Sequence, residues 1–172
     1  MPTLLTLEAL SEDDLNLWIE IYTDPKIMDH IGPTLSKEKA IKLFEKVTVE
    51  NQDNLFYVIR NTHNSQKVGM IGLMTKLTKD SCYELGVMIH KNYSNKGYAY
   101  KATQILLKLA FKQMNAHSVS TRCHVLNSGA NRISKALGFV NKGIISDGKS
   151  ARKFNCWEMT DELFKANNRL SF

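Results

Sequence analysis

The segment spanning residues 83–114 joins a strand-like run to an amphipathic helix through a short loop that contains glycine. In residues 83–90, apolar and other side chains alternate with the period of two expected of a strand. In residues 100–114 the period becomes that of a helix with one apolar stripe. That stripe consists of Ala102, Ile105, Leu106, Leu109 and Ala110. The change of period predicts a strand followed by a helix that packs against a sheet.

The loop itself, Lys96-Gly97-Tyr98-Ala99, is a candidate cradle for a phosphate group. A helix leaves its first backbone N–H groups unpaired and carries about half a positive charge at that end, so anions bind there. Gly97 lacks the Cβ that would stand between those donors and an anion. Glycine is also ordinary in a turn between a strand and a helix, because it relieves backbone strain. The loop taken alone leaves both interpretations open.

A second helix start with small residues follows Asn127. Gly138 stands where a helix C-cap would place glycine, and Phe139 comes directly after it. Asn127 is a good helix N-cap, and this role is compatible with binding a ligand through the same side chain.

Together these two segments resemble the GNAT superfamily of acetyl-CoA-dependent N-acetyltransferases. Residues 94–99, Ser-Asn-Lys-Gly-Tyr-Ala, are similar to its pyrophosphate motif, Gln/Arg-x-x-Gly-x-Gly/Ala. Asn127 with Gly138 and Phe139 is similar to its later helix motif. The Lys-Gly-Tyr-Ala variant, with Leu7-Glu8-Ala9-Leu10 and Asp24-Pro25, resembles the RimJ/RimL-type branch, which acetylates the N-termini of ribosomal proteins. The likeness spans most of the chain.

Four positions depart from the family pattern. Ser94 replaces the leading Gln or Arg of the pyrophosphate motif, and Lys101 stands where branch members often carry Glu. Ala130 and Ser134 replace the Ser or Tyr that protonates the departing thiolate in many relatives. The group that protonates the thiolate is therefore left open between Ser134, Ser128 and water. Four histidines could also carry protons, although isolated histidines are more often structural or exposed; they are His30, His90, His117 and His124.

Length and composition describe an ordinary globular protein. The 172 residues predict a single domain over residues 1–172, and 43% hydrophobic with 23% charged residues argues against disorder. The amino terminus lacks the pattern of a secretory signal, so we expect a cytoplasmic protein. The three cysteines are widely spaced and outside any metal-ligand pattern, which favours free thiols and no metal site; they are Cys82, Cys123 and Cys156.

The net charge of +6 is compatible with polyanionic partners such as nucleic acid, ribosomes or a phosphate-rich cofactor. The lysines are scattered, and no basic stretch is interleaved with aromatic residues. A solvated basic face is the commoner meaning of such charge, so we expect no direct sequence-specific binding of nucleic acid.

The predicted elements follow the order β-α-α-β-β-β-α-β-α-β-β. This order predicts an α+β fold, in GNAT-like form a mixed, mostly antiparallel twisted sheet of six to seven strands flanked by about four helices. The chain makes a parallel step where the helix after the glycine loop crosses to the strand at residues 118–125. We expect Asp24-Pro25 to end the first helix. A ligand is expected at the crossover.

The resemblance implies roles for residues around that crossover. The strand at residues 83–90 and the strand at residues 118–125 would splay apart and free backbone groups for acetyl-CoA. Met88 N–H would stabilise the oxyanion, and Asn127 would bind the pantetheine amide, with Ala130 beside it. The strand residues implied for the pantetheine arm are Val87, Met88 and Ile89. The residues implied for the pyrophosphate are Asn95, Lys96, Gly97, Tyr98, Ala99 and Tyr100.

Acetyl transfer also needs a proton acceptor, because a primary amine is mostly protonated at neutral pH. Glu84 is the candidate for this acceptor. The alternative is that Glu84 is simply a surface glutamate on a strand, with no role in proton transfer. Substrate contacts are expected from the first two helices and the last strand. The candidates are Trp18, Tyr22, Asp29 and Glu158, although aromatic residues at helical spacing are more often core.

The leading prediction is acetylation of a primary amine, namely the N-terminal amine of a protein such as a ribosomal protein. The first alternative is a small-molecule amine: a polyamine, an antibiotic or an amino acid. The second is a module that binds acyl-CoA without chemistry, suggested by Ala130 and Ser134. The expected partners are acetyl-CoA and the acceptor, with a homodimer allowed and no membrane.

Overall fold

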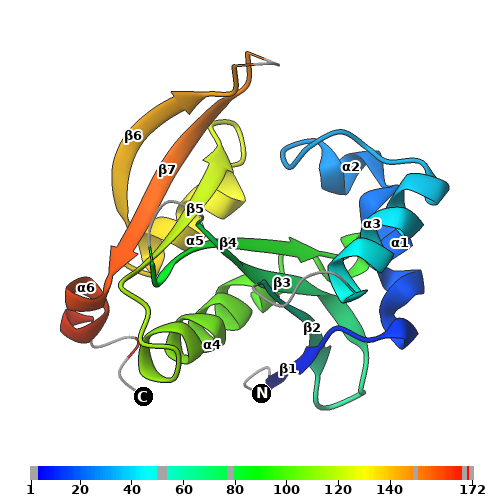
Figure 1. The fold of residues 1–172 in the computed structure, drawn as a ribbon, viewed down its shortest axis with the longest axis horizontal. Helices are drawn as coiled ribbons and strands as arrows, with labels where there is room; N and C mark the ends of the chain where they lie inside the picture. Colours follow the sequence, from blue (N-terminus) through cyan, green and yellow to red (C-terminus); the bar gives the residue numbers. More distant parts are fainter. Residues whose placement is uncertain (1–3, 50–53, 77–79, 149–150, 168–169, 171–172) are drawn as a thin grey trace. The chain divides into compact units, whose positions relative to one another are not determined.

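A computed structural model describes residues 4–49, 54–76, 80–148, 151–167 and 170. Within them, seven strands form a sheet in the order β1-β2-β3-β4-β5-β7-β6 (Figure 1). The strands are β1 Leu5–Ala9, β2 Leu55–Asn61, β3 Lys67–Thr75, β4 Cys82–Ile89, β5 Ser118–His124, β6 Val140–Ser146 and β7 Lys153–Thr160. The helices are α1 Leu15–Tyr22, α2 Pro25–Met28, α3 Lys37–Val49, α4 Tyr98–Lys112, α5 Ser128–Ala136 and α6 Asp161–Ala166. The predicted mixed, mostly antiparallel α+β sheet is confirmed.

The chain divides into two compact units. The first comprises Met1–Leu73 and Gly86–Thr103, and the second comprises Met74–Leu85 and Gln104–Phe172. Strand β4 and helix α4 each begin in one unit and end in the other. The single domain over residues 1–172 stays a prediction.

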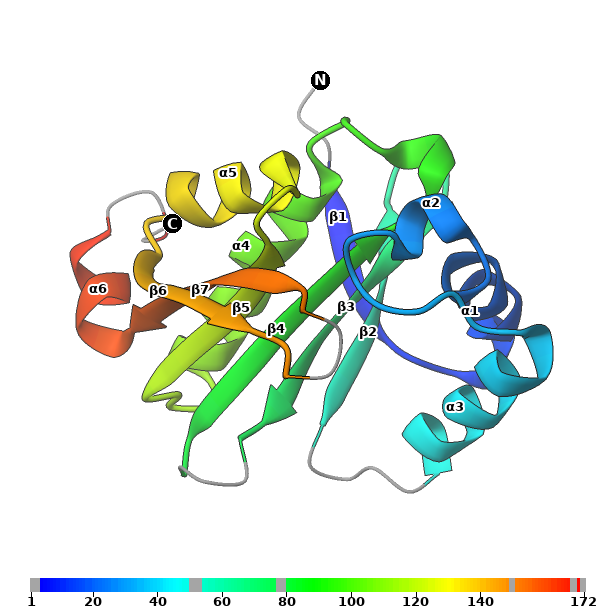
Figure 2. The ribbon, with the colours of Figure 1, turned by 90° about the horizontal axis from the view of Figure 1, so that it is seen from above.

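The first unit packs helices α1 and α3 around one hydrophobic cluster. Its strands are antiparallel, with Leu5 opposite Asn61 where β1 pairs with β2, and its helices gather beside β1–β3 (Figure 2). Trp18 is 1% exposed and donates from Nε1 to the Ala40 carbonyl at 3.0 Å, so the indole nitrogen is satisfied inside the core. The buried members are Leu17, Trp18, Ile21, Ala40, Phe44, Val58 and Met70.

Gly69 on β3 lets the backbone of β4 approach closely. A Cβ at this position would lie 2.3 Å from the Met88 carbonyl oxygen. No flexible side-chain end is available to move aside, because the obstacle is backbone. Glycine at position 69 therefore allows β3 to lie against the part of β4 in which Met88 is a candidate site residue.

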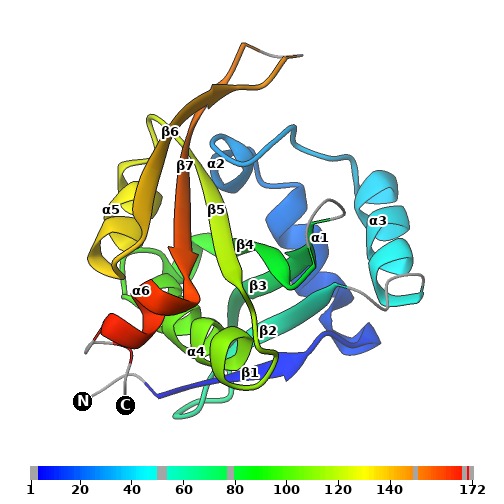
Figure 3. The same cartoon turned by 60° about the vertical axis from the view of Figure 1, so that its left-hand side comes forward.

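The second unit is built on β5, which has a partner strand on either side (Figure 3). It pairs with β7 in antiparallel register from Ser118 opposite Thr160 to His124 opposite Phe154. It also pairs with β4 in parallel, with Cys82 opposite Ser118, Tyr83 opposite Val119 and Glu84 opposite Ser120. The predicted parallel step is therefore confirmed. The expected divergence of the two strands beyond these pairs stays a prediction.

Helix α1 ends at Tyr22, as Asp24-Pro25 predicts, and the same dipeptide starts α2, because the Asp24 carboxylate caps the N–H groups of Lys26 and Ile27. Other local predictions were wrong. Helix α4 begins at Tyr98, two residues before the prediction, and Ile105 of its predicted apolar stripe is 36% exposed. The buried face includes Thr103 and Leu107 instead. Helix α6, with Thr160 as its N-cap, was not predicted.

We expect Gly69→Ala to lower the free energy of unfolding by roughly 1–3 kcal/mol, because the new methyl group meets fixed backbone. Urea denaturation measures the change. Gly148→Ala is the matched control, since a Cβ there meets nothing within 4 Å. Equal midpoints for the two variants would show that β3 and β4 are not in close approach at Gly69.

Candidate functional site

The glycine loop leaves the start of α4 open. Gly97 has φ +80°, a left-handed conformation that residues with a side chain adopt at a cost, and a Cβ built on it would meet nothing within 4 Å. Lys101 N–H already bonds to the Gly97 carbonyl at 3.2 Å. Helix geometry leaves the N–H groups of Tyr98, Ala99 and Tyr100 without an acceptor in the helix. An anion could therefore enter the space beside Gly97 and approach these main-chain donors.

Contacts on both sides hold this loop. The Tyr98 hydroxyl accepts a hydrogen bond from Asn61 Nδ2 at 3.0 Å, and the tyrosine is buried. Tyr93 meets the Tyr98 ring edge to face at 6.2 Å. Lys96 lies over the Tyr93 ring at 5.6 Å and donates to the Asn92 carbonyl at 3.1 Å. The positive charge of Lys96 is thus kept at the loop.

The carboxyl-terminal half of β4 lies in the same unit as the loop. Val87, Met88 and Ile89 are half-buried. After them the His90 N–H bonds to the Val68 carbonyl at 2.9 Å, which aligns the end of β4 with β3. The roles of these three residues toward acetyl-CoA stay predictions.

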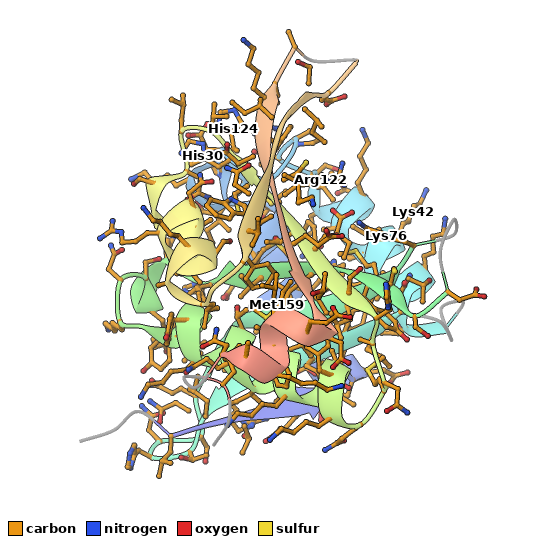
Figure 4. The ribbon with its side chains drawn as sticks, turned by 90° about the vertical axis from the view of Figure 1, so that its left-hand side faces the viewer. His30, Lys42, Lys76, Arg122, His124 and Met159 are labelled. Carbon is orange, nitrogen blue, oxygen red and sulfur yellow. The ribbon has the colours of Figure 1, made fainter. Side chains whose placement is uncertain are left out.

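In the second unit, Glu84 is an ion-paired carboxylate. Its Oε1 accepts from Arg122 Nε at 2.8 Å, and Arg122 comes from β5 (Figure 4). The Glu84 side chain is 26% exposed. A carboxylate has about four acceptor positions, so the arginine leaves capacity for a further donor. This geometry is compatible with Glu84 as a proton acceptor and also with a purely structural ion pair.

Asn127 has the geometry of a helix cap. Its Oδ1 accepts from the Ala130 N–H at 3.1 Å, so its side-chain carbonyl and the Ala130 donor satisfy each other. This cap uses only the side-chain oxygen of Asn127, so the side-chain NH₂ group can donate to a ligand carbonyl.

Ser134 is buried on α5. Its hydroxyl donates to the Ala130 carbonyl at 3.2 Å and lies 3.6 Å from Cys123 Sγ. Burial raises the pKa of the Cys123 thiol. The helix bond uses the one proton of the hydroxyl, so Ser134 could protonate a thiolate only by breaking it.

Asn131 is a hydrogen-bonding centre that the sequence analysis missed. Its Oδ1 accepts from Asn155 Nδ2 at 2.9 Å and from Trp157 Nε1 at 3.0 Å. Its Nδ2 donates to the carbonyls of His124 and Asn127. The only signal in the sequence was an asparagine inside a helical segment, where that residue is unfavourable without such bonds. Asn131 thereby joins α5 to the β5–β7 part of the sheet.

The candidate substrate residues have different environments. Trp18 lies in the core and not on a surface that a substrate could reach, because its ring packs against Tyr22 and Phe44. Burial raises the pKa of Tyr22 to about 12. Asp29 is exposed and 3.8 Å from His30, and Glu158 on β7 is 3.8 Å from Lys142.

Sequence comparison decides the family. The family model for the acetyltransferase (GNAT) domain matches residues 5–140. The chain belongs to the GNAT acetyltransferase family. The GNAT chain is 29% identical over 160 residues to the uncharacterized N-acetyltransferase YnaD of Bacillus subtilis, covering 91% of each.

Solved structures show the same fold. The spermidine N-acetyltransferase of Vibrio cholerae in complex with CoA and spermine aligns with a TM-score of 0.81 at 20% identity, over 94% of this chain and 98% of that one. A GNAT-family acetyltransferase from Bacillus anthracis aligns with a TM-score of 0.80 at 24% identity, over 92% and 95%. Among the described residues of this GNAT protein, no group of His, Cys, Asp and Glu is placed to hold a metal ion. The helices described also include none with the length and apolarity needed to cross a membrane.

We expect Asn131→Ala to cost about 1–3 kcal/mol of unfolding free energy, because it removes the acceptor of the Trp157 and Asn155 donors. Thermal and urea unfolding measure the loss. Asn16→Ala, at an exposed position of α1, is the control. A loss no larger than that of the control would mean that these bonds do not stabilise the second unit.

Proposed function

We propose that this GNAT protein transfers an acetyl group from acetyl-CoA to a primary amine. The observation that carries the proposal is the open, left-handed Gly97 at the start of α4, where main-chain donors remain without helical acceptors. A side chain at this position would take up the space that a pyrophosphate needs.

The residues around Gly97 fit the coenzyme. Backbone N–H groups of Asn95 to Tyr100 would hold the pyrophosphate, and the nearby Lys96 charge would strengthen that binding. The backbone of Val87, Met88 and Ile89 would bind the pantetheine arm. The Asn127 NH₂ group would bind one of its amides, next to Ala130.

Acetyl transfer requires two proton transfers, one away from the acceptor amine and one to the departing sulfur. The acceptor amine must lose a proton before it attacks, and Glu84 is the proposed acceptor, directly or through water. Met88 N–H would stabilise the oxyanion that forms on the thioester carbonyl. Because a thiol has a pKa near 8.5, its thiolate is a tolerable leaving group. Water or Ser128 therefore suffices while the Ser134 proton is used within α5.

Two classes of amine are candidates for the acetyl acceptor. The Lys-Gly-Tyr-Ala motif favours the N-terminal amine of a protein, as in the RimJ/RimL-type branch. The fold shared with the Vibrio cholerae spermidine N-acetyltransferase favours a small amine. Following thiol release from acetyl-CoA with peptides that differ at their first residue, and with polyamines, separates the two. No release with any amine would leave only a module that binds acyl-CoA.

We expect Gly97→Glu to abolish measurable binding of acetyl-CoA. The new side chain fills the open space, places a negative charge against the pyrophosphate and strains the backbone at φ +80°. Titration calorimetry measures the affinity, and thermal unfolding checks that the variant folds. Gly148→Glu adds the same charge at another open glycine and should bind normally. Unchanged affinity in Gly97→Glu would contradict the pyrophosphate site.

We expect Glu84→Gln to lower kcat by about 10²-fold, the effect typical of losing a general base. The loss should be greatest at low pH, where the amine depends most on a protein group to remove its proton. Gln keeps an oxygen for the Arg122 hydrogen bond, so the fold should survive. Rates from pH 6 to 9 test this, with the exposed Glu45→Gln as control. A rate equal to that of the wild type at every pH would assign the proton acceptor to another group.

A further inference from the structure

Three asparagine side chains in the second unit form a hydrogen-bonded series that starts at the bulge in β6. The Gly143 N–H donates to Asn141 Oδ1 at 2.7 Å, and Asn141 Nδ2 donates to Asn155 Oδ1 at 3.2 Å. Asn155 Nδ2 then donates to Asn131 Oδ1 at 2.9 Å. The series therefore runs from β6 across β7 to α5.

Groups that can only donate or only accept fix the orientation of each amide in this series. The Gly143 N–H and the Trp157 indole N–H can only donate, so each of them must meet a side-chain oxygen. Trp157 Nε1 donates to Asn131 Oδ1 at 3.0 Å, which turns Asn131 Nδ2 to the other side. There Nδ2 meets two main-chain carbonyls, which can only accept. Each amide thus has one orientation that satisfies all of its neighbours.

Asn131 Nδ2 closes the turn that leads into α5. It donates to the His124 carbonyl at 2.9 Å and to the Asn127 carbonyl at 2.8 Å. The Asn127 N–H also donates to the His124 carbonyl at 2.9 Å, and the Asn131 N–H donates to the Asn127 carbonyl at 3.1 Å. Each carbonyl therefore uses both of its lone pairs inside the turn. The backbone of Asn127 is tied at its N–H and at its carbonyl.

The direction of the Asn127 side chain follows from this arrangement. Its Oδ1 accepts the Ala130 N–H at 3.1 Å, and this bond together with the tied backbone determines where its NH₂ group lies. Asn131 and Asn155 are half-buried, which limits competition from water for their hydrogen bonds. Without the Asn131 donor, the His124 and Asn127 carbonyls would each keep one partner, and the turn would be freer to move.

We propose that Asn131 is a positioning residue for acetyl-CoA that acts through Asn127, with its own orientation set by Trp157 and Asn155. This inference rests on the proposed function, in which the Asn127 NH₂ group binds an amide of the pantetheine arm. In this role Asn131 makes no contact with the coenzyme and only holds the turn that presents Asn127. The donors beside Gly97 belong to the other unit, so binding of the pyrophosphate should not depend on Asn131.

The first experiment compares acetyl-CoA with 3′-phosphoadenosine 5′-diphosphate, the part of the coenzyme without pantetheine. Asn131→Asp keeps an oxygen for Trp157 and Asn155 but removes the NH₂ donor. It should raise the Kd of acetyl-CoA about three- to tenfold, the loss expected for one neutral hydrogen bond, and leave the Kd of the fragment unchanged. An effect of the added negative charge alone would weaken both ligands, because both carry phosphates. Titration calorimetry measures the two affinities.

Trp157→Phe is the matched control for stability. It removes one donor to Asn131 Oδ1 and a buried indole, but Asn155 still orients Asn131. The variant should therefore lose stability and still bind acetyl-CoA with the affinity of the wild type. Thermal unfolding of both variants shows whether their losses of stability are comparable.

The second experiment asks whether Asn131 acts through Asn127. Asn127→Ser keeps an oxygen that can cap α5 but lacks the NH₂ group, so it should raise the Kd of acetyl-CoA about as much as Asn131→Asp. The double variant should bind no more weakly than Asn127→Ser alone, because both changes remove the same hydrogen bond to the coenzyme. Asn155→Asp places an acceptor against Asn131 Oδ1 and should also raise this Kd, whereas Asn155→Ala should not.

The outcomes separate this inference from the proposed function. If the wild type binds acetyl-CoA and Asn131→Asp binds it as tightly, the positioning role is overturned and acetyl transfer stands. An equal loss of affinity for the fragment or in Trp157→Phe, or additive losses in the double variant, would overturn it as well. If Asn131→Asp does not fold, equal affinities of Asn155→Asp and Asn155→Ala overturn it. If the wild type binds no acetyl-CoA, the proposed function itself fails, and the inference falls with it.

Discussion

The left-handed backbone at Gly97 is the constraint on which the candidate site depends. At φ +80° the chain turns from the segment after β4 into α4, and it does so without placing a side chain beside the first helical N–H groups. Asn61 and Tyr98 hold the first turn of α4 from one side, and Tyr93 with Lys96 holds the loop from the other. The donors are therefore arranged before any anion arrives, which lowers the entropic cost of binding.

A site built on main-chain donors tolerates changes in its side chains. Ser94 in place of a longer residue would leave the proposed main-chain donors in place. Ser134 and Asn127 use their hydrogen-bonding groups to stabilise and cap α5. The proposed chemistry then needs few side chains: Glu84, tied to Arg122, and a source of a proton for sulfur. The family match over residues 5–140 covers all of these positions.

The first unit combines two different electrostatic surroundings. Near Gly97, main-chain N–H groups and Lys96 favour an anion. Around Glu20 and Asp24, two carboxylates lie beside His90 and Lys91. The overall charge of +6 gives no indication of this local difference, because net charge averages over the whole surface.

Much of the fold could be predicted from the sequence because periodicity is a local property. Alternation and helical stripes located all seven strands and the longer helices, and Gly97 with Asn127 and Gly138 identified the family. Contacts between distant segments decided the rest. Trp18 became a core residue because Ala40 offered its carbonyl, and Ile105 became exposed because α4 packs on a neighbouring stripe. The Glu84–Arg122 pair follows from strand register, and the Glu20–His90 pair joins residues 70 positions apart. Only tertiary packing decides such pairings, since the hydrogen bonds of a side chain depend on what the fold brings within about 3 Å of it.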